Sequence, residues 1–273
     1  PTPPPTPRRA APSDRLPVSL LETAAILLAG VAAGSINAVV GSGTLITFPT
    51  LLAFGVPPVT ANVSNNVGLF PGSLSAAWGY RRELAGQRRR VLRLGVASLL
   101  GGTVGAVLLL VLPEDAFATI VPVLVLLGVV LVVVQPAVSR RVAARRASRG
   151  PGAAARDGAA WVWPAVLATG VYGGYFGAAQ GVLLMGVLGI GVEEGLQRLN
   201  AVKNVLAGTV NGVAAVVFVA VADVDWRIVA VIAVGAVVGG QLGAHLGRRL
   251  PPLLLRAVIV AVGTTAFVVL VLG

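Results

Sequence analysis

The chain has 273 residues, of which 56% are hydrophobic and 11% are charged, and its mean hydropathy is +0.89. This composition excludes an ordinary soluble domain and, with apolar runs of membrane-spanning length along the chain, predicts an all-α polytopic membrane protein. A formal net charge of +11 would suggest nucleic acid as a partner of a soluble protein. Here the arginines lie in short connectors between apolar segments, so we expect the lipid bilayer as a partner and no nucleic acid.

In chain order, residues 1–17 are rich in proline and polar residues and are typical of a disordered lead-in. An N-terminal transmembrane repeat is expected over residues 18–136. Its apolar segments cover residues 18–40, 44–54, 59–80, 92–112 and 117–134. The second of these is too short to cross about 30 Å of hydrocarbon, which predicts a broken or re-entrant helix.

A connector with six arginines follows at residues 137–159 and is expected to be a cytoplasmic linker. The C-terminal repeat then covers residues 160–273, with apolar segments at 161–176, 181–192, 196–222, 226–246 and 253–272. About ten segments result, five in each half. An odd number of crossings in each half would invert the second half relative to the first and would place both termini outside.

The two halves share an internal duplication. Residues 41–66 form a glycine-rich break, an apolar run and a helix that contains asparagines, and residues 177–204 repeat this order. The matching positions are Gly43 and Gly181, Asn62 and Asn200, and Asn66 and Asn204, and all three pairs are separated by the same offset in the chain. A duplication of this kind predicts one polar site built from both halves.

An anion that crosses hydrocarbon must exchange its water for fixed donors, and helix N-termini at the breaks would supply them. On this interpretation, one N-terminus presents Ser42, Gly43 and Thr44, and the other presents Gln180 and Gly181. Their positive dipole ends would face the substrate. The alternative is that the glycines only allow tight helix packing.

Asn62 and Asn66 stand four residues apart and so share one helix face, as do Asn200 and Asn204. Asn65 corresponds to Lys203, the single lysine of the chain, which lies in an apolar helix. An intramembrane ammonium costs about 2.5 to 3.5 kcal/mol on insertion scales, so we interpret Lys203 as a partner of a bound anion. The alternative is that the lysine snorkels to the interface and the asparagines join helices.

These breaks, the apolar run with Pro49, the glycine at Gly55 and the length of the chain together resemble the TauE/SafE family of sulfite and organosulfonate exporters. The resemblance covers roughly residues 20 to 272. It implies an inner-membrane carrier that exports small sulfur-containing anions or related organic acids, coupled to a gradient of protons or sodium. The chain departs from the family's usual glycine cluster, with Gly41-Ser42-Gly43 in one half and Gly177-Ala178-Ala179-Gln180-Gly181 in the other.

Other functions were weighed against a carrier. An anion channel, or an importer of another small anion such as thiosulfate or a carboxylate, stays open as an alternative. The chain has no cysteine, a single histidine, and neither an HExxH motif nor a phosphate-binding GxxxxGK[ST] loop, so we expect no enzyme, no cofactor and no metal site. Glu22 and His245 are weaker candidates for proton coupling. A homodimer is a further expectation.

Overall fold

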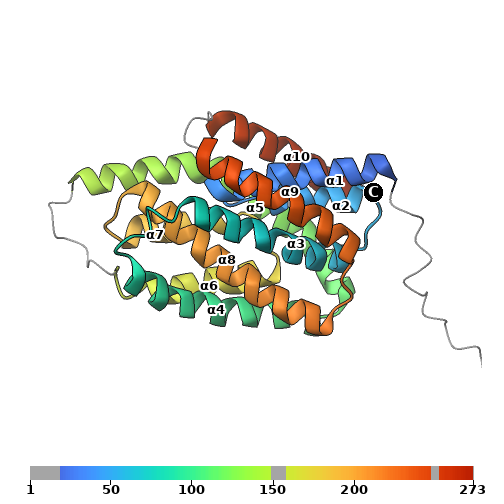
Figure 1. Ribbon diagram of the computed structural model, residues 1–273, viewed down its shortest axis with the longest axis horizontal. Coiled ribbons are helices and arrows are strands. Elements are labelled where there is room, and N and C mark those ends of the chain that lie inside the picture. The colour runs from blue at the N-terminus through green and yellow to red at the C-terminus, as the bar shows by residue number, and fades with distance from the viewer. Residues whose placement is uncertain (1–18, 149–157, 247–251, 273) are drawn as a thin grey trace, which may run out of the picture.

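The computed structural model describes residues 19–148, 158–246 and 252–272, and within them the chain forms ten α-helices and no strand (Figure 1). The helices are α1 (Leu20–Val39), α2 (Thr44–Ala53), α3 (Pro58–Gly79), α4 (Arg88–Val111), α5 (Glu114–Ser148), α6 (Val162–Tyr175), α7 (Gln180–Gly191), α8 (Leu196–Val221), α9 (Trp226–Leu246) and α10 (Pro252–Leu272). The predicted all-α class is confirmed. The lead-in expected at residues 1–17 lies outside the described residues.

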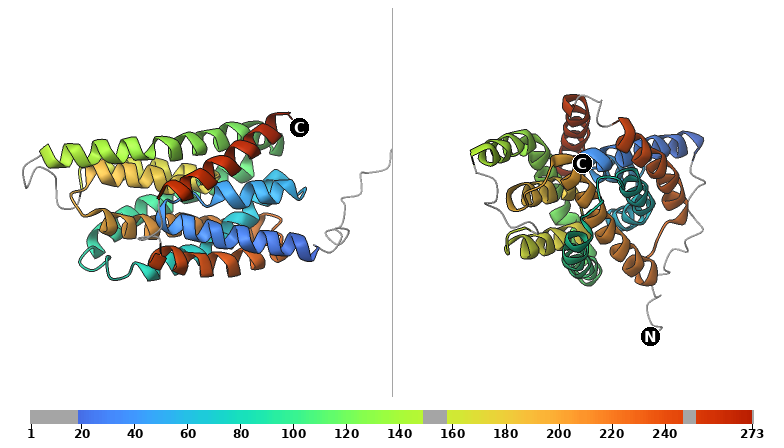
Figure 2. Two further views of the ribbon diagram at one scale, coloured as in Figure 1. Left: turned by 90° about the horizontal axis from the view of Figure 1, so that it is seen from above. Right: turned by 60° about the vertical axis from the view of Figure 1, so that its left-hand side comes forward.

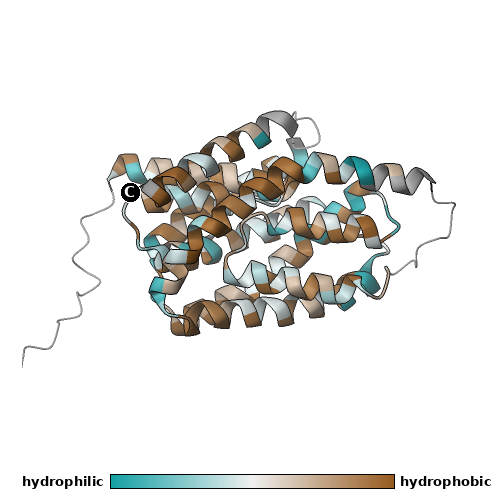
Figure 3. Cartoon of the chain, turned by 180° about the vertical axis from the view of Figure 1, so that it is seen from behind, coloured by the Kyte–Doolittle hydropathy of each residue, from teal (hydrophilic) through white to brown (hydrophobic). Residues whose placement is uncertain are grey.

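Five of the described helices are long and apolar enough to cross a membrane, namely α1, α4, α8, α9 and the first 28 residues of α5. Many large apolar side chains on these helices are exposed. Hydrophilic residues gather toward the two ends of the bundle (Figure 3). A multi-pass membrane protein is therefore confirmed. The sequence predicted about ten segments, but α2 and α7 have only 10 and 12 residues. At 1.5 Å per residue they span about 15 and 18 Å, well short of the hydrocarbon core.

Two helix boundaries differ from those expected. The helix α4 begins at Arg88, so Arg88, Arg89 and Arg90 form its first turn, although we expected them in the preceding loop. Arginine is a good helix former, and this turn is paired with acidic and amide groups described below. The helix α5 continues to Ser148, so the first part of the expected 137–159 linker is helical, and residues 149–157 lie outside the described residues.

Local sequence accounts for several helix starts. Ser19 and Glu22 form a capping box at α1, in which the Ser19 hydroxyl accepts from the Glu22 N–H and the Glu22 carboxylate accepts from the Ser19 N–H. Pro58 is the first residue of α3, where its missing N–H needs no partner. These signals set where each helix enters the bundle.

The chain breaks twice near the middle of the bundle. Residues 40–43 separate α1 from α2, and residues 176–179 separate α6 from α7. Gly41 has a φ of +88° and Ala179 has a φ of +59°, so each break contains a residue in the left-handed region just before the short helix begins. Figure 2 shows α2 running back toward the end of the molecule where α1 begins. The helices α1 and α2 therefore form one interrupted pair, and α6 and α7 form the other.

Glycines allow the helices to pack backbone to backbone. The principal contacts join α1 to α9, α3 to both α8 and α9, and α4 to both α6 and α8. A Cβ atom on Gly105 of α4 would lie 2.1 Å from the carbonyl oxygen of Val171 on α6, and one on Gly239 of α9 would lie 2.1 Å from that of Val31 on α1. Small residues at such positions let helices associate closely in lipid.

We predict that Gly105→Ala lowers the thermal stability of the detergent-purified protein, by roughly 1 to 3 kcal/mol, because the added methyl group would force α4 away from α6. Gly95→Ala is the matched control on the same helix, since a Cβ at Gly95 meets nothing within 4 Å. Melting curves of the two variants would measure the difference. Equal melting temperatures would show that α4 and α6 do not pack as described.

Candidate functional site

The two breaks touch each other. The N–H of Gly181, at the start of α7, donates to the carbonyl oxygen of Gly41, which precedes α2, at 3.0 Å. A Cβ on Gly41 would lie 2.3 Å from the Cα of Gly181, so only glycine fits this approach. The tips of two interrupted helix pairs, one from each half of the chain, are thereby joined at one point.

A polar cavity of about 30 Å³ lies at this contact. It is lined by residues from both halves of the chain, namely Asn37, Gly41, Thr44, Ser73, Ala76, Gly177, Gln180, Gly181, Asn204, Ala207 and Asn211. Such a volume accommodates a few water molecules at most. A bulky or hydrated anion would therefore require the walls of the cavity to move.

Four of the predicted site residues line the cavity, namely Thr44, Gln180, Gly181 and Asn204. The Gln180 side chain is buried, and its Nε2 atom has no hydrogen-bond partner among the described residues. Ser42 lies in the break itself, and its buried hydroxyl likewise has none there. A buried donor without a partner is costly, so both groups are suited to a polar ligand.

Three polar residues of the cavity were not predicted as site residues, namely Asn37, Ser73 and Asn211. The Asn211 amide donates to the Ser73 hydroxyl at 3.1 Å, across the two halves. These two residues are 138 positions apart, which is the offset of the internal duplication. The duplication offset therefore could have identified this pair, although serine and asparagine do not match by residue type.

The backbone donors at the helix starts are already bonded in this conformation. The Gly43 N–H donates to the Asn37 side-chain oxygen at 2.6 Å, and the Gly181 N–H donates to Gly41 as described. Helix N-termini were expected to face an anion. In the structure, protein oxygens occupy these two donors, so an anion would have to replace them.

The side chain of Lys203, a residue of α8, reaches the carboxyl end of α1. Its fully buried ammonium donates to the carbonyl oxygens of Asn37 at 2.8 Å and of Ala38 at 3.3 Å. The amides of Asn200 and Asn204 also donate to Ala38, at 3.0 and 3.2 Å. A cation at the negative end of a helix dipole is favourable, so three predicted site residues here hold the broken end of α1.

The asparagines of the first half have different partners. The Asn62 amide donates to the Tyr175 carbonyl at 2.9 Å, at the end of α6. Asn65 bonds to Thr44 and Thr47 of α2. Asn66 is buried but does not line the cavity, and its Oδ1 atom has no partner among the described residues.

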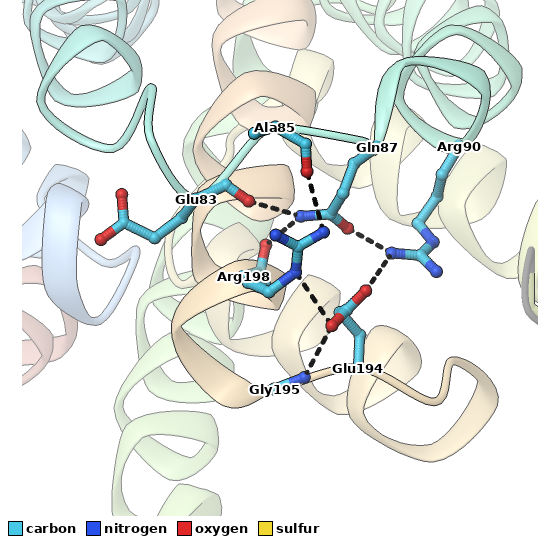
Figure 4. Close-up of polar contacts among 7 residues, drawn as sticks. All are labelled: Glu83, Ala85, Gln87, Arg90, Glu194, Gly195 and Arg198. Atoms are coloured by element: carbon cyan, nitrogen blue, oxygen red, sulfur yellow. Dashed lines mark hydrogen bonds and ion pairs between the residues drawn. The ribbon is translucent and has the colours of Figure 1, made fainter.

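A charged cluster joins the two halves where α4 and α8 begin, which we call the arginine-rich end of the molecule (Figure 4). The Glu194 carboxylate pairs with Arg90 of α4 at 3.4 Å and with Arg198 of α8 at 2.9 Å. The Gln87 amide donates to the Arg198 carbonyl at 3.1 Å, and its oxygen accepts from Arg90. Burial alone would raise the pKa of Glu194, but the Gly195 N–H and the two arginines outweigh it and lower that pKa. The carboxylate therefore stays charged and ties α4 to α8.

A helical bundle with several membrane-length helices, and with a polar cavity where two interrupted helix pairs meet, defines a membrane transporter. The comparison with known families agrees. The family model described as "Sulfite exporter TauE/SafE" matches residues 26–270. The chain belongs to the TauE/SafE family, as the resemblance in the sequence predicted.

Two curated relatives match most of the chain, and a third matches part of it. The "Probable membrane transporter protein YfcA" of Escherichia coli (strain K12) is 26% identical over 246 residues, which cover 90% of this chain and 88% of the relative. A "Probable membrane transporter protein" of Haemophilus influenzae is 25% identical over 240 residues, covering 87% and 89%. The "Probable membrane transporter protein ORF9" of a Sinorhizobium species is 33% identical over 102 residues, covering 37% and 39%. Family and relatives indicate a transporter and not an enzyme.

We predict that Lys203→Met lowers the thermal stability by about 1 to 3 kcal/mol, because the carbonyl oxygens at the end of α1 lose a charge-assisted donor. Arg93→Met is the control, since Arg93 is an exposed cation of α4. Melting temperatures of the purified variants would be compared. If Lys203→Met melted with the parent protein, the ammonium would not be holding α1.

Proposed function

We propose that this chain is a secondary transporter that exports small sulfur-containing anions, such as sulfite, organosulfonates or related organic acids, across the inner membrane. Transport would be driven by an ion gradient. The observation that supports this most is the contact of the two helix breaks beside a cavity lined from both halves. In membrane carriers, broken helices place backbone and polar side chains at the middle of the bilayer, where a substrate must be bound.

The chemistry of the cavity suits an anion. Its polar side chains are amides and hydroxyls, and none of the residues that line it is a carboxylate. Gln180 and Asn211 can donate N–H groups to an oxyanion, and Thr44 can donate an O–H group. The Ser73 hydroxyl donates to the Leu69 carbonyl of its own helix. The ammonium of Lys203 lies close by, on the carbonyls of Asn37 and Ala38, and adds positive potential.

We also propose that residues 18–136 and 160–273 are inverted repeats. The helices α8, α9 and α10 begin at the duplication offset from α3, α4 and α5 respectively. The contacts between the halves have the same symmetry. The helix α1 of the first half packs on α9 of the second, and α6 of the second half packs on α4 of the first. If the two interrupted pairs are re-entrant from opposite faces, three full crossings remain in each half, and that odd number also inverts the second half.

The arginine-rich end would face the cytoplasm, as the positive-inside rule requires. The start of α4 and the carboxyl end of α5 both lie at this end of the molecule (Figure 1). The small cavity and the bonded helix starts fit a closed carrier better than an open pore. Export would then require this face to open, the anion to enter, and the opposite face to release it.

We predict that Asn211→Leu slows anion transport about tenfold or more, because removing a partly buried donor from the cavity costs about 1 to 3 kcal/mol of substrate binding. The matched control on the same helix is Thr209→Val, because the Thr209 hydroxyl donates to its own helix at Val205. Initial rates would be measured in proteoliposomes with sulfite, short sulfonates, thiosulfate and carboxylates. Failure of the parent protein to move any of these anions, or equal rates in the two variants, would contradict the proposal.

A further inference from the structure

Two buried polar groups without a hydrogen-bond partner stand at matching positions of the two breaks. Ser42 lies just before α2 and Gln180 begins α7, and the offset of the internal duplication separates them. Ser42 is fully buried and Gln180 is 4% exposed, and neither the Ser42 hydroxyl nor the Gln180 Nε2 atom bonds to any described residue. A buried donor without a partner destabilises the folded state, and a polar ligand that accepts from it offsets that penalty.

The Gln180 amide has a defined place against α6. A Cβ on Gly173 would lie 2.3 to 2.5 Å from the Cδ, Nε2 and Oε1 atoms of Gln180, so the amide lies directly on this glycine. Gln180 also lines the cavity. The first half has Ser35 at the position of Gly173, and its hydroxyl donates to the Gly239 carbonyl of α9. In the second half, packing therefore fixes a long amide at the cavity while its Nε2 atom stays unbonded.

The charge around the cavity suits an anion with one negative charge. None of the residues that line the cavity is charged. Lys203 adds one positive charge nearby, at the carbonyl oxygens of Asn37 and Ala38, and Asn37 lines the cavity. The cost of moving an ion from water into an apolar bundle rises steeply with its charge, so a second negative charge would need a second cation.

We propose that the cavity selects small singly charged oxyanions, such as hydrogen sulfite or a short alkyl sulfonate, over dianions, and that the Gln180 amide contacts the bound anion. The Ser42 hydroxyl, next to Gly41 in the cavity wall, is the matching donor of the first half. The inference rests on the proposed transport function, which it deepens by naming the charge of the substrate and a residue that contacts it.

The first test compares two glutamines of the bundle in the absence of added oxyanion. Gln180→Met removes an amide whose Nε2 atom has no bond, so the melting temperature of the purified protein should stay the same or rise. Gln241→Met is the matched control. It removes an amide that donates to the Ser75 carbonyl of α3 at 2.9 Å, so its melting temperature should fall. An equal fall in both variants would show that Gln180 is a structural residue and would overturn the proposal.

The second test is anion binding to the purified protein. Methanesulfonate, a singly charged anion, should raise the melting temperature in a saturable way, because a ligand that binds only the folded state stabilises it. Thiosulfate, a dianion, should need at least about tenfold higher concentration for the same rise at one ionic strength. Gln180→Met should lose the saturable rise and Gln241→Met should keep it. The rise that remains in Gln180→Met measures the non-specific effect of each salt.

Three results of the binding test would overturn the proposal. They are a parent protein without a saturable response to methanesulfonate, a saturable response that persists in Gln180→Met, and an equal affinity of the parent protein for thiosulfate.

Transport in proteoliposomes then distinguishes this inference from the proposed function. Thiosulfate flux at the rate of methanesulfonate, or undiminished flux in Gln180→Met, would refute the inference and leave the transport function standing. Saturable binding of methanesulfonate without flux of any anion in the panel would refute the transport function and leave the binding site standing. Methanesulfonate flux that exceeds thiosulfate flux, and that Gln180→Met loses while Gln241→Met keeps it, would support both.

Discussion

The structure depends on how backbone polar groups are satisfied at two helix breaks inside an apolar bundle. In hydrocarbon an unbonded N–H or C=O costs several kcal/mol, so irregular backbone is tolerated only where protein or a wet cavity supplies partners. Here each break supplies one hydrogen-bond partner to the other, because the Gly181 N–H donates to the Gly41 carbonyl oxygen. Asn37, Lys203 and Asn204 bond further groups of the same region. A polar site shared by two halves follows from that requirement.

The two halves of the chain differ at two sets of matching positions. Lys203 holds the broken end of α1 with a charge, whereas Asn65, at the matching position, joins neutral oxygens of α2. The ends of the bundle differ as well. Arg90 and Glu194 form an ion pair at the arginine-rich end, and the residues at the matching offsets, Ile228 and Val56, are buried in the apolar core. An ionic contact at one end and an apolar contact at the other would give the two faces different energies of opening.

Much of the fold and part of the site could be predicted from the sequence, because hydropathy and the constant offset between the repeats can be read without knowing which residues are in contact. Those signals predicted the family, the helical class and the position of both breaks. They also identified Gln180 and Asn204, which line the cavity. The pairing of Asn211 with Ser73 was missed, because serine and asparagine do not match by residue type although the two positions stand at the duplication offset. Lys203 was expected to face an anion, but backbone carbonyls lie closest to it, and no side-chain pattern reveals where another helix ends.

The most direct test of the shared site is a cross-link between the halves. The chain has no cysteine, so Ser73→Cys with Asn211→Cys would be the only thiol pair in the protein. After mild oxidation in membranes, mass spectrometry should find the peptides of α3 and α8 joined. The control pair, Ser75→Cys with Asn211→Cys, should stay reduced, because the Ser75 hydroxyl donates instead to Val237 of α9. Cross-linking of the control pair alone, or of neither pair, would contradict a site built where the two halves meet.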